Sequence, residues 1–161
     1  MRVATITCSD TRTEANDEGG AMLGGLLAGA GFEVVSHRIV REETIGLRTA
    51  AADVLARSDV DALIMTGGTG LAPRDNTIEA LRPLIDKEVV GFGEAFRRLS
   101  WEQVGARAIL SNALAGVAKD KVVIALPGSP KAVSLAVEQL ISPTLGHLVA
   151  LVRGRTAHPT P

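Results

Sequence analysis

Hydrophobic and polar positions in the first half of the chain form short blocks that predict alternating strands and helices. The first block, 3–7, is rich in β-branched residues and stops at a polar loop. The next begins after Asn16 or Asp17, both suitable N-caps, and its apolar residues keep helical spacing up to Gly31, where a C-cap belongs. The remaining blocks predict a strand at 32–40, a helix at 44–57 and a strand at 62–65.

This order of elements predicts a parallel sheet joined by right-handed crossovers. We therefore expect an α/β fold, a three-layer sandwich with a mostly parallel central sheet and helices on both faces. The first helix contains four internal glycines, each of which weakens a helix by roughly 1 kcal/mol relative to alanine. Close packing on the sheet is the expected compensation. These glycines are Gly19, Gly20, Gly24 and Gly25.

The second half of the chain predicts a hairpin and further helices. Asn76 with Glu79 three residues later resembles a capping box and predicts a helix through Leu84, and apolar spacing predicts another helix after Gly91. The segment 108–117 is too short and broken for a good helix. Paired with 122–126 across a charged turn, it predicts one antiparallel edge strand.

Two Ser-Pro pairs predict two final helices. Ser129 with Pro130 starts a helix through about Ile141, and Ser142 with Pro143 repeats the signal. Residues from Arg153 onward have no core pattern. We therefore expect one domain over 1–152 and a flexible C-terminal tail over 153–161.

Composition narrows the classes of function. A chain of 161 residues with 46% hydrophobic and 22% charged residues suits one globular domain. A net charge of -1, with three Phe, one Trp and no Tyr, argues against nucleic acid as a partner. The single Cys8 forms no internal disulfide, and no run approaches ~18 apolar residues. We expect no signal peptide, because a charge follows the first apolar stretch too soon. We expect a cytoplasmic protein with no membrane partner.

The strongest local signal is a glycine-rich loop directly after the predicted strand 62–65. Glycines beyond the carboxyl end of a strand let backbone N–H groups approach phosphate oxygens. The loop lacks both the P-loop and the dinucleotide-binding spacing. A phosphate cradle is our interpretation, and a flexible turn without a ligand is the alternative. The loop consists of Thr66, Gly67, Gly68, Thr69 and Gly70.

Charged residues follow that loop closely. Asp75 is placed to hold Mg²⁺ that bridges phosphates, because this cation favours one or two carboxylates together with phosphate oxygens. Arg74 is placed to offset phosphate charge or to pair with a surface acid. By spacing alone, a helix-capping or dipole role for Asp75 is an equally good account.

Two other strand ends carry candidate residues. Gly128 and Ser129 turn sharply into a helix N-terminus, a ready anion site to which Lys131 adds charge, although an ordinary capped turn also explains the sequence. Ser9 and Asp10 end the first strand, where spacing alone favours a capped turn. The three histidines have no ligand spacing, so we expect no zinc site.

Four segments in combination and order resemble the MoaB/MogA family of molybdenum cofactor biosynthesis proteins, with a MoaB-like character. The resemblance runs from about Arg2 to Val152, and the ordered combination is more specific than any one segment. The segments are Thr66-Gly67-Gly68-Thr69-Gly70, Pro73-Arg74-Asp75, Gly91-Phe92-Gly93-Glu94 and Leu126-Pro127-Gly128-Ser129-Pro130.

The resemblance implies a molybdopterin-binding fold, commonly a homotrimer and possibly a higher oligomer. Catalytic members of the family use Mg²⁺ and ATP to adenylylate molybdopterin. Asp75 matches the essential carboxylate after the glycine loop, and Ser9, Asp10, Ser129 and Lys131 match positions in the other two loops.

Glu42 departs from the family pattern. Adenylylating members carry an Asp after the second strand, whereas Glu42 is longer by a methylene, which shifts a bound oxygen by about 1 Å and costs roughly 100-fold if the geometry is strict. Asn112 likewise replaces a common Arg. Three hypotheses follow: a molybdopterin adenylyltransferase with Asp75 and Glu42 as catalytic and metal-binding residues, a non-catalytic molybdopterin carrier, and a binder of another phosphorylated metabolite.

Overall fold

The computed structural model describes residues 1–155, and their centre is a six-stranded mixed sheet. The strand order is β2-β1-β3-β6-β5-β4. The first four of these strands are parallel, and β5 runs antiparallel to both of its neighbours. The strands are β1 (Arg2–Cys8), β2 (Glu33–Val40), β3 (Ala62–Thr66), β4 (Lys87–Glu88), β5 (Leu114–Ala118) and β6 (Lys121–Leu126).

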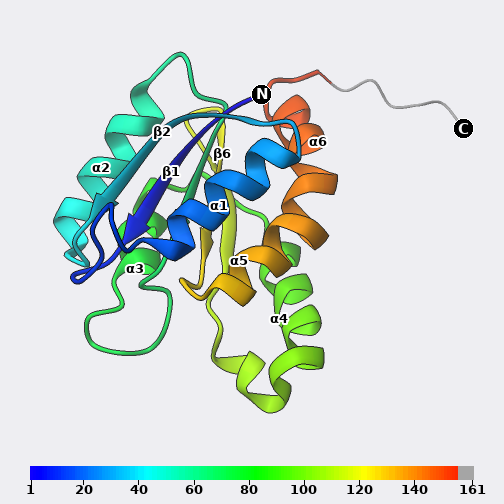
Figure 1. Cartoon of the computed structure of the whole chain (residues 1–161). Coiled ribbons are helices and arrows are strands. Elements are labelled where there is room, and N and C mark those ends of the chain that lie inside the picture. Colours follow the sequence, from blue (N-terminus) through cyan, green and yellow to red (C-terminus); the bar gives the residue numbers. More distant parts are fainter. Residues whose placement is uncertain (156–161) are drawn as a thin grey trace, which may run out of the picture.

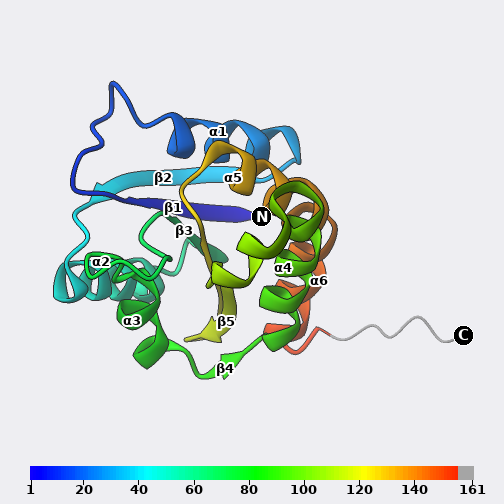
Figure 2. The same ribbon diagram turned by 90° about the horizontal axis from the view of Figure 1, so that it is seen from below.

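Helices cover both faces of this sheet, so the three-layer α/β sandwich predicted from the sequence is confirmed (Figures 1 and 2). One layer packs on the side chains of Val3, Ile64 and Ile124, and the other on those of Ala4, Leu63 and Val123. Neighbouring positions of one strand thus serve opposite layers, as the pleat requires. The first layer contains α1 (Glu18–Gly29), α4 (Val90–Val104), α5 (Pro130–Ala136) and α6 (Ser142–Val152), and the second α2 (Thr44–Ala56) and α3 (Thr77–Leu81).

The antiparallel strand is shorter than we expected. Residues Gly105–Leu110 form the 3₁₀ helix η2, and β5 begins only at Leu114. Ile109 and Leu110, which we expected in this strand, are 67% and 53% exposed, and the prediction of a strand is therefore wrong for 108–113. A short 3₁₀ helix, η1 (Arg82–Leu84), completes the helical segment that begins at α3.

The two final helices form one continuous helical run, Pro130–Val152, in which residues Val137–Ile141 adopt a π-helical turn. Pro143 lacks an amide hydrogen and its ring clashes with a regular preceding turn, so a widened turn just before it lets the helix continue.

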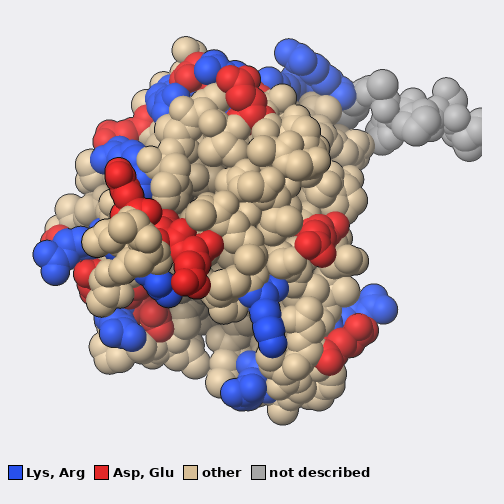
Figure 3. Space-filling view, viewed as in Figure 1, with Lys and Arg blue, Asp and Glu red and all other residues tan. Residues whose placement is uncertain are grey.

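By length and composition the helical run Pro130–Val152 is apolar enough to cross a membrane. Here Val133, Ile141 and Leu145 of its inner face lie in the core. The space-filling view shows few charges over the face where α1 and α6 lie (Figure 3).

The helix ends in a Schellman motif at the start of the expected tail. The amide of Gly154 donates to Leu151 O and that of Arg155 to Ala150 O, with Gly154 in the left-handed region (φ 66°). The Arg153 side chain bonds Asp61 at the start of β3. Residues 156–161 of the predicted tail lie outside the described residues.

The glycines of α1 divide into two pairs. A Cβ on Gly20 would overlap the Asp17 carboxylate and lie 2.6 Å from Thr7 Oγ1, and one on Gly19 would lie 3.0 Å from Gly128 O. Gly24 and Gly25 have no atom within 4 Å of the corresponding position. Close packing therefore explains the first pair, and the compensation that we expected is wrong for the second.

This division predicts opposite effects of alanine in one helix. Gly25→Ala should raise the free energy of unfolding by about 1 kcal/mol, because it adds helix propensity in open space. Gly20→Ala should lower it by about 1–3 kcal/mol, because the new methyl group overpacks the polar cluster beneath the helix. Urea denaturation of both variants beside the parent checks this, and two changes of the same sign would contradict it.

Candidate functional site

The candidate site lies where β1, β3 and β6 end at one edge of the sheet. The backbones of the three following loops touch there. The Gly67 amide donates to Leu126 O at 3.0 Å, and a Cβ on Gly128 would lie 3.1 Å from Gly67 Cα. Gly67 has φ 98°, and a Cβ on it would overlap the carbonyl oxygen of Cys8. Only glycine fits at Gly67, and this close approach joins the three loops.

The glycine loop has unused amide donors. The Gly67 amide is occupied by Leu126, but the amides of Gly68, Thr69 and Gly70 have no acceptor in the part of the chain that the structure describes. Thr77 closes the loop from α3, because its hydroxyl donates to Gly67 O at 2.8 Å and its amide to Gly68 O at 3.0 Å. Thr66 Oγ1 donates to Pro127 O at 3.2 Å. The expected cradle is thus held from both sides, and its open donors begin at Gly68.

Carboxylates gather beside these donors. Asp75 Oδ2 accepts the Ala72 amide at 2.8 Å and lies against Gly70, whose Cβ would be 2.5 Å from it. The Glu42 side chain lies against Gly68, with 3.6 Å between its Cδ and a Cβ built there. Glu42 Oε2 is buried without a hydrogen-bond partner. Two acids therefore flank the glycine loop from opposite sides.

The electrostatics of Glu42 reflect this crowding. Burial raises the pKa of the Glu42 carboxyl, and repulsion from Asp75 and then Asp10 raises it further, against an opposing effect of Arg74. Its backbone is fixed on both sides, since its amide donates to Asp10 Oδ1 at 3.1 Å and its carbonyl accepts Asn76 Nδ2 at 2.9 Å. The Asn76 side chain makes this contact instead of capping α3.

Ser9 and Ser129 both use their hydroxyls in turns. Ser9 Oγ accepts the amides of Thr11 and Arg12, each at 3.2 Å. Ser129 Oγ caps α5 by accepting the Ala132 amide at 3.3 Å. Both residues shape loops at the sheet edge.

Two pockets share the wall formed by Gly68 and Gly128. The β1 pocket, about 210 Å³, also has Ser9, Arg12 and Glu42 in its lining. The η2 pocket, about 360 Å³, also has Asp75, Arg107 and Ser111. The glycine loop therefore borders two hollows, and at least one acidic residue lines each of them.

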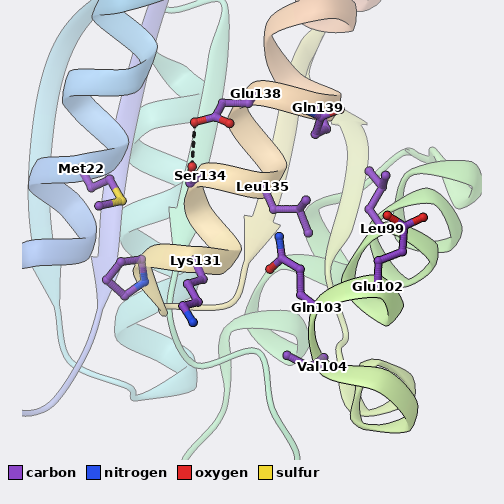
Figure 4. A pocket seen from close by; sticks show the side chains of 11 residues that line it. Met22, Leu99, Glu102, Gln103, Val104, Lys131, Ser134, Leu135, Glu138 and Gln139 are labelled. Atoms are coloured by element: carbon purple, nitrogen blue, oxygen red, sulfur yellow. Dashed lines mark hydrogen bonds between the residues drawn. The ribbon is translucent and has the colours of Figure 1, made fainter.

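A third and larger hollow lies away from the glycine loop. A groove of about 860 Å³ runs between α1, α4 and α5, and Lys131 lines it beside Met22 and Leu135 (Figure 4). Ser134 donates to Glu138 within the same groove at 2.7 Å. Lys131 is therefore not brought to the two pockets at the sheet edge, while Arg74 is exposed close to Glu42.

Sequence reasoning missed several lining residues. Asp17 was recognised only as a possible N-cap, yet its carboxylate also bonds His37 Nε2 at 3.0 Å and lines the β1 pocket. Burial opposes this charge, but the nearby Thr7 hydroxyl, the Gly20 amide and His37 together lower the pKa of Asp17. No sequence spacing indicates the contact between Asp17 and His37, since it depends on β2 lying under α1.

Cys8 also lines the β1 pocket. Burial raises the pKa of its thiol to about 12, and the negative charge of Glu42 adds to this against a hydrogen bond with Thr77. A thiol with this pKa stays protonated and is a poor nucleophile. Cys8 is therefore a packing residue of the buried strand end.

Comparisons with known proteins agree with this geometry. Residues 4–147 match the family model described as a probable molybdopterin binding domain. The chain is 46% identical to molybdenum cofactor biosynthesis protein B of Bacillus cereus over 149 residues, covering 92% of this chain and 88% of the relative. It is 47% identical to the protein of that name from Staphylococcus aureus over 152 residues, covering 92% and 90%.

Solved structures show the same relationship. A crystal structure of molybdenum cofactor biosynthesis protein B matches with a TM-score of 0.93 and 44% identity, covering 96% of both chains. The tungsten cofactor synthesizing protein MoaB from Pyrococcus furiosus matches with a TM-score of 0.83 and 35% identity, covering 96% of this chain and 97% of that one. The chain therefore belongs to the MoaB/MogA family of molybdopterin-binding domains.

Proposed function

We propose that this protein acts in molybdenum cofactor biosynthesis by binding molybdopterin at the sheet edge and adenylylating it with Mg-ATP. The observation that carries the proposal is the run of open amides at Gly68, Thr69 and Gly70 between Asp75 and Glu42. Such amides bind phosphate oxygens, and both proposed substrates carry phosphate. The relatives named molybdenum cofactor biosynthesis protein B support the pathway.

The two pockets support a reaction between two anions. Both pockets have Gly68 and Gly128 in their linings, so two neighbouring anion sites fit beside the glycine loop. In the proposed reaction a terminal phosphate oxygen of molybdopterin attacks the α-phosphorus of ATP. A new P–O bond forms, the bond from the α-phosphorus to the bridging oxygen breaks, and pyrophosphate leaves. The open amides orient the reacting groups and stabilise the added negative charge.

The acids at the site fit Mg²⁺. Glu42 Oε2 is buried and has no hydrogen-bond partner, and Asp75 and Asp10 repel the charge of the Glu42 carboxylate. A bound cation would offset the free energy that this buried, repelled charge costs. No three His, Cys, Asp or Glu among the described residues form a complete metal site. That agrees with Mg²⁺, which takes one or two carboxylates and completes its shell with water and phosphate. Asp75 and Glu42 would hold the ion, which when bound would neutralise charge on the phosphates.

A second candidate, a molybdopterin carrier without turnover, is favoured by Glu42 alone. Its side chain is one methylene longer than the Asp of adenylylating members, and its backbone is fixed by Asp10 and Asn76. The extra length is therefore not absorbed by a shift of the chain. In this hypothesis the phosphate-binding amides are retained while the reacting groups are misaligned.

The proposal includes a homotrimer. Supporting it, an apolar surface at the junction of α4 and η2 contains Trp101, Val104, Ile109 and Leu110, which are 54%, 41%, 67% and 53% exposed. A cluster of this kind is typical of surfaces that other chains cover. Sedimentation equilibrium would measure the mass, and a monomer at micromolar concentration would contradict the trimer.

Turnover tests the activity directly. The protein incubated with molybdopterin, ATP and Mg²⁺ should release pyrophosphate and form adenylyl-molybdopterin. Asp75→Ala should lower kcat at least about 100-fold, because it removes a carboxylate of the metal site. Chromatography of the pterin product measures turnover, with an active relative as control. Full activity in Asp75→Ala would contradict the proposed role of Asp75 in holding the metal.

The same assay separates the two candidates. If the protein is a carrier, calorimetry should detect molybdopterin binding without ATP consumption, and Glu42→Asp should create activity. Rapid turnover by the unmodified protein would exclude the carrier hypothesis.

The raised pKa of Glu42 predicts a pH-dependent stability. A carboxyl with a higher pKa in the folded state binds its proton more tightly there, so folding stability falls as pH rises from the unfolded pKa through the folded one. Without Mg²⁺, Glu42→Gln should therefore melt above the parent at pH 7, and the gap should close toward pH 4. Added Mg²⁺ should stabilise the parent more than the variant. Differential scanning calorimetry measures both effects, and a lower melting temperature of Glu42→Gln at pH 7 would refute this account.

A further inference from the structure

The η2 pocket is lined by an arginine side chain, Arg107, that forms no ion pair with the described residues. Arg107 is the one Lys or Arg among its described lining residues, and Gly68, Gly70 and Asp75 line the same pocket. Within the described chain, the Arg107 side chain makes no ion pair within 4 Å and no hydrogen bond. By contrast, Arg57, Arg82 and Arg153 each pair with an acid.

The segment that carries Arg107 is fixed against the glycine loop. Asn112 Nδ2 donates to Gly70 O at 3.4 Å, and Arg97 Nη1 donates to Ser111 O at 3.3 Å. These two contacts join the end of η2 to the loop on one side and to α4 on the other. Arg107 therefore projects from a backbone whose position relative to the amides is set.

Ser111 adds an independent sign of a polar ligand. Its Oγ is buried, has no hydrogen-bond partner among the described residues, and belongs to a residue that lines the same pocket. A buried hydroxyl without a partner is costly unless a ligand or water completes it. The pocket thus combines a free guanidinium, an unpartnered hydroxyl and open backbone amides, all of which donate to an anion.

We infer that Arg107 binds a phosphate group of the ligand in the η2 pocket and makes this pocket select phosphorylated ligands. A guanidinium matches phosphate with two parallel hydrogen bonds, and the adjacent Ser111 hydroxyl and Gly70 amide supply further donors. The inference deepens the proposed function, on which it rests for the identity of the phosphorylated ligand. It assigns to Arg107 a binding role that is independent of Asp75 and of metal.

Isothermal titration of the full chain with molybdopterin, Mg-ATP and inorganic pyrophosphate tests this inference. Arg107→Ala should weaken binding of at least one of these probes roughly 10- to 100-fold, as expected for the loss of charge-assisted hydrogen bonds. Arg38→Ala is the matched control, because it removes the same charge from an exposed position in β2 that lines neither pocket at the sheet edge. Its affinities should stay within about twofold of the parent.

The conservative variants separate binding from a structural role. Arg107→Lys should keep part of the affinity, while Arg107→Gln should lose as much as Arg107→Ala. The dependence of binding on salt should weaken in Arg107→Ala and Arg107→Gln only. Melting temperatures of all three should match the parent, because Arg107 has no partner whose loss would destabilise the fold.

The outcomes also separate this inference from the proposed activity. Equal affinities of parent and Arg107→Ala for every probe would overturn the role of Arg107 and leave the adenylyltransferase proposal standing. Binding that depends on Arg107 without any turnover would support the inference and count against the activity. A parent that binds none of the three probes would overturn both.

Discussion

The candidate site depends on the close approach of three backbones at the edge of the sheet. Gly67 donates to Leu126 O while lying against Cys8 O and Gly128, so the loops after β1, β3 and β6 are joined at a single residue. No side chain fits there. Because this contact consumes the Gly67 amide, the open donors are displaced one residue onward, to the point where Asp75 and Glu42 flank the loop. The constraint that builds the site thus also decides which amides remain available.

Two acids, Glu42 and Asp75, lie beside the loop that this contact fixes. Glu42 is crowded by Asp75 and Asp10 and carries a raised pKa, which is a cost in the protein alone. Such a cost is typical of sites that a cation or a charged ligand completes. Arg107 and Ser111 show the opposite imbalance, with donors that lack acceptors. Asp75 lines the same pocket as Arg107 and Ser111, whereas Glu42 lines the other pocket, and both pockets share Gly68.

Family membership narrows the chemistry, although it does not replace these contacts. The relatives and solved structures place the chain among molybdopterin-binding domains. The two proposed functions differ in the role of Glu42, whose backbone is fixed by contacts to Asp10 and Asn76. The contacts of this scaffold are compatible with either proposed role, because catalysis requires finer alignment than binding.

The sequence alone determined the layered fold and the glycine loop, because strand alternation, helix spacing and glycine punctuation are local properties that short segments express on their own. It also proposed Asp75, which follows the glycine loop, and Glu42, which follows the second strand, as site residues. It could not show that Ile109 and Leu110 belong to an exposed 3₁₀ helix. Apolar residues in a sequence do not reveal whether their side chains are buried or exposed in the folded chain. Tertiary structure alone decided that Lys131 lies in another groove, that Asp17 contacts His37 and that Arg107 lines one pocket with the glycine loop. These facts depend on which elements the sheet order brings together, and that order joins residues far apart in the chain.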